Sequence, residues 1–249
     1  MLSLLLAAQI LVTQVSFPSK DPGVTLTGTL YQPPGLTAPA PAVVVLHACD
    51  GIDDAAISWA DWLAQNGYVA LMVDSFGPRH VDRVCGTHDV PSSQRALDAY
   101  GGLAYLRTLP NVDGAHVGEI GFSHGGGTIL WTENAGIAER TGFSQNGFAV
   151  AVALYPPCEP HAASSLLFPL TILIGGADNW TDARECQQWL ARVDPNGTQG
   201  SIHVYPGVYH KFDDPSANKI ALKRYILRYD PDASADAHQR VLAIFKQSL

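Results

Sequence analysis

The sequence predicts a doubly wound α/β protein, in which a mostly parallel sheet is covered by helices on both faces. Short runs of branched apolar residues, such as AVVVLHA (42–48), are typical of parallel strands buried on both faces. Segments with helical spacing of their apolar residues separate these runs. This alternation continues through residues 10–249 without an internal repeat, so we expect a single domain over that range.

The first half of the chain is expected to form one edge of the sheet and its first parallel strands. TQVSFPS (13–19) and VTLTGTLYQPPG (24–35) alternate like the two strands of an edge hairpin. Continuous apolar runs then predict strands at 42–48 and 68–74. Amphipathic spacing predicts one helix that stops at a glycine and a second that stops before a proline, at 56–67 and 92–109.

The second half repeats the same alternation. It has four further apolar segments with strand character, at 116–122, 147–156, 169–176 and 201–207. Three segments have helical character, at 127–139, 181–193 and 235–249. The last of these closes the chain.

The composition and the N-terminal residues bear on where the protein is located in the cell and on which classes of partner it binds. The chain has a formal net charge of −8 and no dense run of Lys and Arg, which argues against nucleic acid as a partner. No apolar run has membrane-spanning length, so we expect no stable insertion into a membrane. We expect the protein to be a monomer or a small homo-oligomer. Residues 1–9 fit either the remnant of a signal segment or a first strand, although the positively charged start of a signal is absent. We favour export, periplasmic or secreted, over a cytoplasmic location.

A serine stands in an unusually glycine-rich turn, EIGFSHGGGTILW (119–131). Gly121, Ser123 and Gly125 fit the G-x-S-x-G pattern, in which a nucleophilic serine occupies a sharp turn between a strand and a helix. Glycine tolerates the close contacts and backbone angles that such a turn requires. The alternative is a glycine-rich loop with an incidental serine. The rest of the chain must therefore supply a base and an acid.

Two later strand ends supply them. In this arrangement the expected order is serine, acid, histidine, and ligands bind outside the carboxyl ends of the strands. Asp178 follows the apolar run ILIGG directly, although an aspartate there also fits a cap of the next helix. Among the nine histidines only His210 lies after Asp178 and at a strand end. We therefore predict the triad Ser123–Asp178–His210.

Ester or amide hydrolysis also needs donors for the oxygen that becomes negative in the transition state. The backbone N–H of His124, the residue after the nucleophile, is one candidate. The other is expected in the loop HACDGI, after strand 42–48, where we favour the N–H of Cys49 and keep that of Ala48 as the alternative.

The four cysteines are widely spaced and contain no CxxC pair, which argues against a zinc site. Four buried thiols and two disulfides are both compatible with the sequence. Neighbouring strand ends would bring together the loops that hold Cys49 and Cys85, and likewise those that hold Cys158 and Cys186. We therefore predict the pairs Cys49–Cys85 and Cys158–Cys186, which would suit an oxidising compartment.

The segments VVVLHACDGI, LMVDSFGPR, GFSHGG, ILIGGADNWT and YPGVYHKFD together resemble the dienelactone hydrolase family, over about residues 20–249. The resemblance implies a small α/β-hydrolase fold without a large lid domain, and a hydrolase that needs no metal or cofactor. It also carries Ser123, Asp178 and His210 over as the triad. The founding enzymes of the family use a cysteine nucleophile with a nearby glutamate, for which this chain has Ser123 and Ala48. Dienelactone itself is therefore not the expected substrate.

The expected function is that of a serine carboxylesterase acting on small to medium esters through an acyl-enzyme. Two alternatives remain, a serine peptidase of the same fold and a non-catalytic binding protein with this fold. The family resemblance also makes Arg79 a candidate for binding a substrate carboxylate, with packing of a surface loop as the alternative. Three aromatic residues next to the predicted triad or at a strand end are candidates for lining the pocket, with ordinary packing as the alternative: Tyr155, Trp180 and Tyr209.

Overall fold

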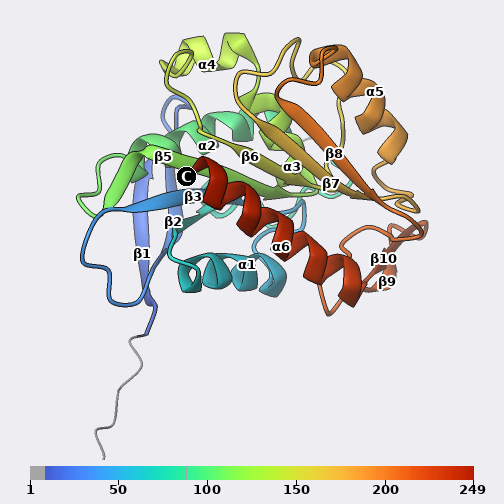
Figure 1. Ribbon diagram of the computed structural model, residues 1–249, viewed down its shortest axis with the longest axis horizontal. Helices are drawn as coiled ribbons and strands as arrows, with labels where there is room; N and C mark the ends of the chain where they lie inside the picture. Colours follow the sequence, from blue (N-terminus) through green and yellow to red (C-terminus); the bar gives the residue numbers. More distant parts are fainter. Residues whose placement is uncertain (1–8, 88) are drawn as a thin grey trace, which may run out of the picture.

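A computed structural model describes residues 9–87 and 89–249, and its centre is an eight-stranded sheet (Figure 1). In sheet order the strands are β1 (Leu11–Pro18), β2 (Thr25–Gln32), β4 (Val69–Asp74), β3 (Ala40–Leu46), β5 (Val112–Phe122), β6 (Ala151–Leu154), β7 (Leu170–Gly175) and β8 (Gly200–Tyr205). The strands from β4 to β8 run parallel, while β1 and β2 pair antiparallel at one edge. This is the predicted mostly parallel sheet with an antiparallel edge hairpin.

Helices cover both faces of the sheet. On one face α1 (Asp54–Gln65) and α6 (Pro231–Ser248) lie side by side, and the rings of Trp59 and His238 stack between them with centroids 3.7 Å apart (Figure 1). The other face is covered by α2 (Ser92–Leu106), α3 (His124–Thr132), α4 (Ala135–Thr141) and α5 (Ala183–Val193). Among the described residues, none of the helices combines the length and apolar character that a membrane crossing requires.

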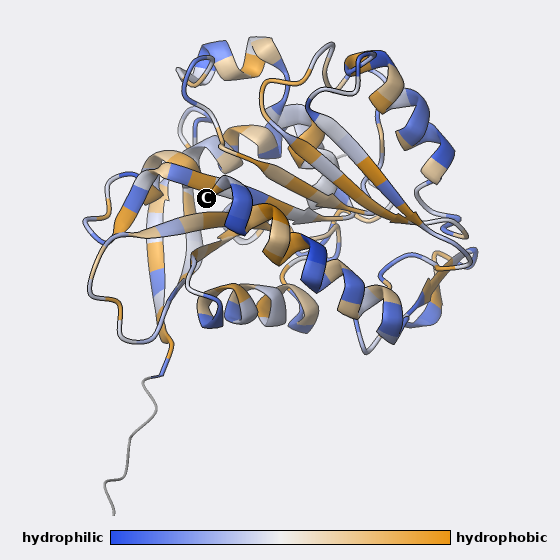
Figure 2. Ribbon diagram, viewed as in Figure 1, coloured by the Kyte–Doolittle hydropathy of each residue, from blue (hydrophilic) through white to orange (hydrophobic). Residues whose placement is uncertain are grey.

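The apolar strands are buried because both faces are covered. Val43, Val44 and Val45 of β3 have no exposed side-chain surface, as expected for a central parallel strand. Figure 2 shows apolar residues along the sheet and polar residues on the outward sides of α5 and α6. The carboxyl ends of the parallel strands consequently meet at one edge of a rigid, closely packed layer.

Three features differ from the sequence prediction. The helix predicted at 127–139 is two helices, because Asn134 interrupts it and its side chain accepts a hydrogen bond from the N–H of Ile137 at the start of α4. A short hairpin of β9 (Asn218–Ala221) and β10 (Tyr225–Arg228) was not expected. A 3-10 turn, η1 (Gly77–Arg79), follows β4. The segment 1–9 lies, apart from Gln9, outside the described residues, so its two interpretations stay open.

Candidate active site

The turn between β5 and α3 holds Ser123 in a conformation that few side chains adopt. Its φ is 51°, in the left-handed region that is costly for a residue with a Cβ atom. The flanking glycines make the turn sterically feasible. A Cβ at Gly121 would collide with the backbone of Gly125, and a Cβ at Gly125 would collide with the carbonyl oxygen of Leu46. The G-x-S-x-G spacing is thus required for α3 to pack this closely.

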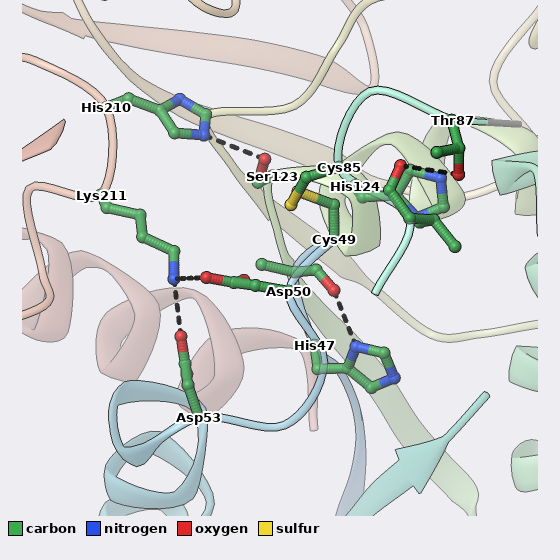
Figure 3. Close-up of a disulfide and its surroundings, with 12 residues drawn as sticks. His47, Cys49, Asp50, Asp53, Cys85, Thr87, Ser123, His124, His210 and Lys211 are labelled. Atoms are coloured by element: carbon green, nitrogen blue, oxygen red, sulfur yellow. Dashed lines mark hydrogen bonds and ion pairs between the residues drawn. A yellow bond between two sulfur atoms is a disulfide. The ribbon is translucent and has the colours of Figure 1, made fainter. Parts of the chain in front are cut away.

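The structure brings Ser123, His210 and Asp178 together at the carboxyl ends of the strands. Ser123 follows β5, Asp178 follows β7, and His210 lies in the loop after β8. His210 Nε2 is 2.9 Å from Ser123 Oγ, and His210 Nδ1 is 2.7 Å from Asp178 Oδ2 (Figure 3 shows the first contact). All three residues are buried, which limits competition from water for these hydrogen bonds.

Asp178 is held by the residues that follow it. One carboxylate oxygen accepts hydrogen bonds from the N–H groups of Trp180 and Thr181, at 2.8 and 2.9 Å. The hydroxyl of Thr181 donates to the other oxygen at 2.9 Å and lies 3.2 Å from His210 Nδ1. The sequence analysis missed Thr181. A hydroxyl residue three positions after an aspartate at the end of a strand is the local signal that would have found it.

The two predicted oxyanion donors both line the cavity beside Ser123. His124 is the first residue of α3, so its N–H has no acceptor within the helix, and the helix dipole favours negative charge there. Within the part of the chain that the structure describes, the N–H of Cys49 also has no acceptor. The structure therefore leaves both groups available to a substrate oxygen.

A buried guanidinium, which the sequence analysis missed, connects the segments that carry these donors. Arg95 of α2 is fully buried; it donates to the carbonyl oxygen of His47 at 2.9 Å and lies 2.8 Å from Nδ1 of His124. Because a guanidinium only donates, Nδ1 of His124 is the acceptor. Burial, and secondly the charge of Arg95, lower the pKa of His124 to about 3, so this imidazole is neutral. No carboxylate among the described residues lies within ion-pair distance of Arg95.

A second buried histidine, His47, follows the end of β3 and contacts the same loop. His47 is fully buried, and its Nδ1 lies 2.8 Å from the carbonyl oxygen of Ala48. Its Nε2 accepts a long hydrogen bond, 3.4 Å, from the N–H of Ser75. Burial lowers the pKa of His47 well below its ordinary value, so the imidazole is neutral. Its role is to hold the loop through these two contacts rather than to act as a base.

A cavity of about 360 Å³ opens next to Ser123. Its lining includes the disulfide-bonded Cys49 and Cys85 and the aromatic rings of Trp180 and Tyr225. These two rings stack with centroids 4.6 Å apart, and Trp180 also contacts His210, with centroids 5.2 Å apart. The cavity is therefore mostly apolar, with the serine at one wall.

Both cysteine pairs predicted from strand neighbourhood are present as disulfides. Cys49 is bonded to Cys85 and Cys158 to Cys186, with Cα atoms 4.9 and 5.0 Å apart (Figure 3 shows the first). Among the described residues, Cys49, Asp50 and Cys85 form a group whose possible metal-ligand atoms all lie within 4.8 Å of one another. Because both sulfurs are joined in the disulfide, they offer no thiolate to a metal.

Of the four residues predicted to contact substrate, Trp180 alone lines this cavity. Arg79 does not reach it; its guanidinium donates to Asp98 at 2.8 and 2.9 Å and to Asp21 at 3.1 Å. Tyr155 is buried beneath His210, and its hydroxyl donates to Asp213 at 2.7 Å. Tyr209 packs against Arg228 instead, 4.8 Å from ring centroid to guanidinium carbon. These three positions agree with the packing alternative, because each side chain already has partners within the protein.

The residue after His210 fixes the loop that carries it. Lys211 is buried, with φ 56°, and its Nζ lies 2.8 Å from Asp50 and 2.6 Å from Asp53 (Figure 3). The two aspartates, with burial opposing them, raise the pKa of Lys211, so it stays charged. This ion-pair group joins the histidine loop to the segment that follows Cys49. The sequence analysis missed it, since no local pattern marks a lysine as buried.

The model of the dienelactone hydrolase family matches residues 26–249. A Synechocystis protein with the provisional name carboxymethylenebutenolidase is 26% identical, over 98% of this chain and all of that protein. A Bradyrhizobium protein, provisionally named a 2-oxo-3-(5-oxofuran-2-ylidene)propanoate lactonase, is 24% identical over 73% of this chain and 77% of its own. The crystal structure of dienelactone hydrolase from Anabaena variabilis superposes with a TM-score of 0.72 at 20% identity, covering 97% of this chain and 99% of that one.

Proposed function

Because the chain belongs to the dienelactone hydrolase family, and is therefore a hydrolase of that family, we propose that it is a serine carboxylesterase. Its substrates are small to medium esters, and the reaction proceeds through an acyl-enzyme. The observation that carries the proposal is the continuous hydrogen-bonded line from Asp178 through His210 to Ser123. The residues of the line have the roles that activation of a serine requires.

In the first half of the reaction His210 Nε2 accepts the proton of Ser123 as Oγ attacks the ester carbonyl carbon. Asp178 accepts the hydrogen bond from Nδ1–H and stabilises the charged imidazole that forms. The N–H groups of His124 and Cys49 bind the carbonyl oxygen while it is negative. The tetrahedral intermediate then collapses, the alcohol takes the proton from His210, and the acyl group stays on Ser123.

The second half repeats these steps with water. His210 takes a proton from a water molecule, the resulting hydroxide equivalent attacks the acyl carbon, and the same N–H groups hold the negative oxygen. Collapse returns the proton to Ser123 Oγ and releases the carboxylic acid. Each role falls on a group that lies in or beside the cavity.

An active-site titration tests this proposal. A fluorophosphonate probe should label wild-type protein at Ser123, as identified by peptide mass, and p-nitrophenyl esters should give a burst of about one nitrophenol per chain if deacylation is slow. Ser123→Ala is the matched control for both. Parallel ester and amide substrates with the same acyl group separate an esterase from a peptidase. A protein that binds esters without labelling or turnover would instead support the non-catalytic alternative.

Two disulfides support export to an oxidising compartment, as the cysteine pattern suggested. A test is the redox state of the cysteines in protein taken directly from its native compartment and alkylated at once. Four alkylated cysteines in such protein would contradict export.

A further inference from the structure

The β9–β10 hairpin has a charge opposite to that of the rest of the chain. Residues 218–228, NKIALKRYILR, contain four cations and no carboxylate: Lys219, Lys223, Arg224 and Arg228. This leaves eleven Lys and Arg against 23 Asp and Glu, a formal charge of −12, in the remaining residues. All four side chains are exposed, and none has an ion-pair partner within the described residues.

Aliphatic side chains are exposed between these cations. Ile220 is 66% exposed and Leu222 is 45% exposed. The register pairs Ile220 with Ile226, and because side chains alternate along a strand, Arg228 lies on the same face as this pair. The outer face of the hairpin therefore combines isoleucines with arginine, and its turn combines Leu222 with Lys223. Aliphatic side chains next to Lys and Arg are typical of segments that lie at the surface of a membrane.

The hairpin is built directly onto the loops of the proposed triad. The N–H of Arg228 donates to the carbonyl oxygen of His210 at 3.1 Å. The side chain of Asn179, next to Asp178, exchanges two hydrogen bonds of 2.9 Å with the backbone of Arg224 and Ile226. Figure 1 shows the hairpin beside the ends of β7 and β8, and Tyr225 lines the cavity. The basic and apolar surface thus borders the opening of the active site.

We propose that the β9–β10 hairpin docks the protein on an anionic lipid surface, with the cavity opening toward it. Lys223, Arg224 and Arg228 contact lipid headgroups, and Ile220 and Leu222 enter the boundary between headgroups and acyl chains. The remaining −12 charge is repelled by the same surface, so the hairpin is the part of the molecule that turns toward it. A soluble polyanion is the less suitable partner, because it leaves the exposed aliphatic side chains unexplained.

Vesicle flotation at low salt tests the proposal and does not depend on the ester substrate. Wild-type protein should bind vesicles of phosphatidylglycerol and phosphatidylcholine, lose most of that binding at high salt, and bind pure phosphatidylcholine far more weakly. Lys223→Gln with Arg224→Gln, two exposed cations at the turn of the hairpin, should weaken binding about tenfold or more, since each cation near such a surface contributes about fivefold. The control is Lys20→Gln with Lys246→Gln, two exposed lysines outside the hairpin, which changes the net charge equally and should alter binding less than twofold.

Ile220→Ser separates a lipid surface from a polyanion. It should weaken vesicle binding several-fold, leave binding to heparin unchanged, and leave hydrolysis of a soluble ester at the wild-type rate. Thermal melting verifies that each variant is folded. Wild-type protein that ignores phosphatidylglycerol, or hairpin variants that bind vesicles as the wild type does, would overturn the proposal. Tight heparin binding together with unchanged vesicle binding by Ile220→Ser would assign the surface to a polyanion.

Discussion

Replacing Glu133 by glutamine should stabilise the protein in mildly alkaline solution. Glu133 is buried at the end of α3, and one of its oxygens accepts hydrogen bonds from the N–H groups of Leu167 and Phe168. Its other oxygen has no partner among the described residues. Burial is the main reason why the pKa of Glu133 rises from 4.5 to about 8, and the two backbone donors oppose it. The folded protein must therefore hold a proton that the unfolded chain releases.

The sign and size of the effect follow from this difference. Below about pH 4.5 both states are protonated, and Glu133 contributes no pH dependence. As the pH rises to about 8 the unfolded chain binds fewer protons, so stability is lost at up to about 1.4 kcal/mol per pH unit. The upper limit is about 5 kcal/mol, and relaxation and water entry should reduce it to about 2–3 kcal/mol. For a chain of this length that is about 4–12 °C in Tm.

Urea unfolding of Glu133→Gln and wild type at about pH 5 and about pH 8.5 measures this gain. Glutamine keeps an acceptor for Leu167 and Phe168 but cannot ionise. The variant should therefore be little different at the lower pH and more stable at the higher one. Glu139→Gln, an exposed glutamate on α4, is the matched control and should show neither change. Equal differences at both pH values would refute a buried, proton-holding carboxyl.

Three further changes test the site and its supports. Ser123→Ala should lower kcat by several orders of magnitude with little change in Tm, as measured by nitrophenyl ester kinetics and calorimetry. Arg95→Met should lower kcat by about 10- to 100-fold at similar KM, because the segments that carry the two oxyanion donors lose their common hydrogen-bond partner. The same change should raise Tm, because it removes a buried cation that has no carboxylate partner. A parallel fall in Tm and activity would show a structural role only. Cys158→Ser with Cys186→Ser should cost about 2–4 kcal/mol by urea unfolding, since the bond closes a loop with a sequence separation of 28; unchanged unfolding would contradict this.

Features with a local cause could be predicted from the sequence. The apolar runs of β3, β4 and β7 read directly as buried strands, and the strand-end position of Asp178 followed from β7. The strand predicted at 116–122, which forms the end of β5, gave the position of Ser123. The expected order of serine, acid and histidine along the chain then selected His210, which lies after Asp178 and at a strand end. The family resemblance agreed with this independent assignment, and the family match covers most of the chain.

Features that depend on contacts between distant segments could not be predicted. Arg95 and Lys211 have ordinary sequence surroundings, and only the packing of α2 and of the histidine loop shows that both are buried. The family resemblance made Arg79 a candidate for contacting substrate, with packing as the alternative, but Asp98, 19 residues later, accepts hydrogen bonds from its guanidinium. The β9–β10 strands are four residues each, too short for alternation alone to reveal them.

The positions of the two disulfides have a consequence for how the chain matures. Each bond joins segments that follow neighbouring parallel strands, β3 with β4 and β6 with β7, so the sulfurs meet only after those strands have paired. Oxidation is thus expected to be a late event that locks a sheet already assembled, rather than a guide to its assembly. Chains made under reducing conditions should reach the same backbone arrangement, and an oxidant added afterwards should close the native pairs without a search among the alternatives.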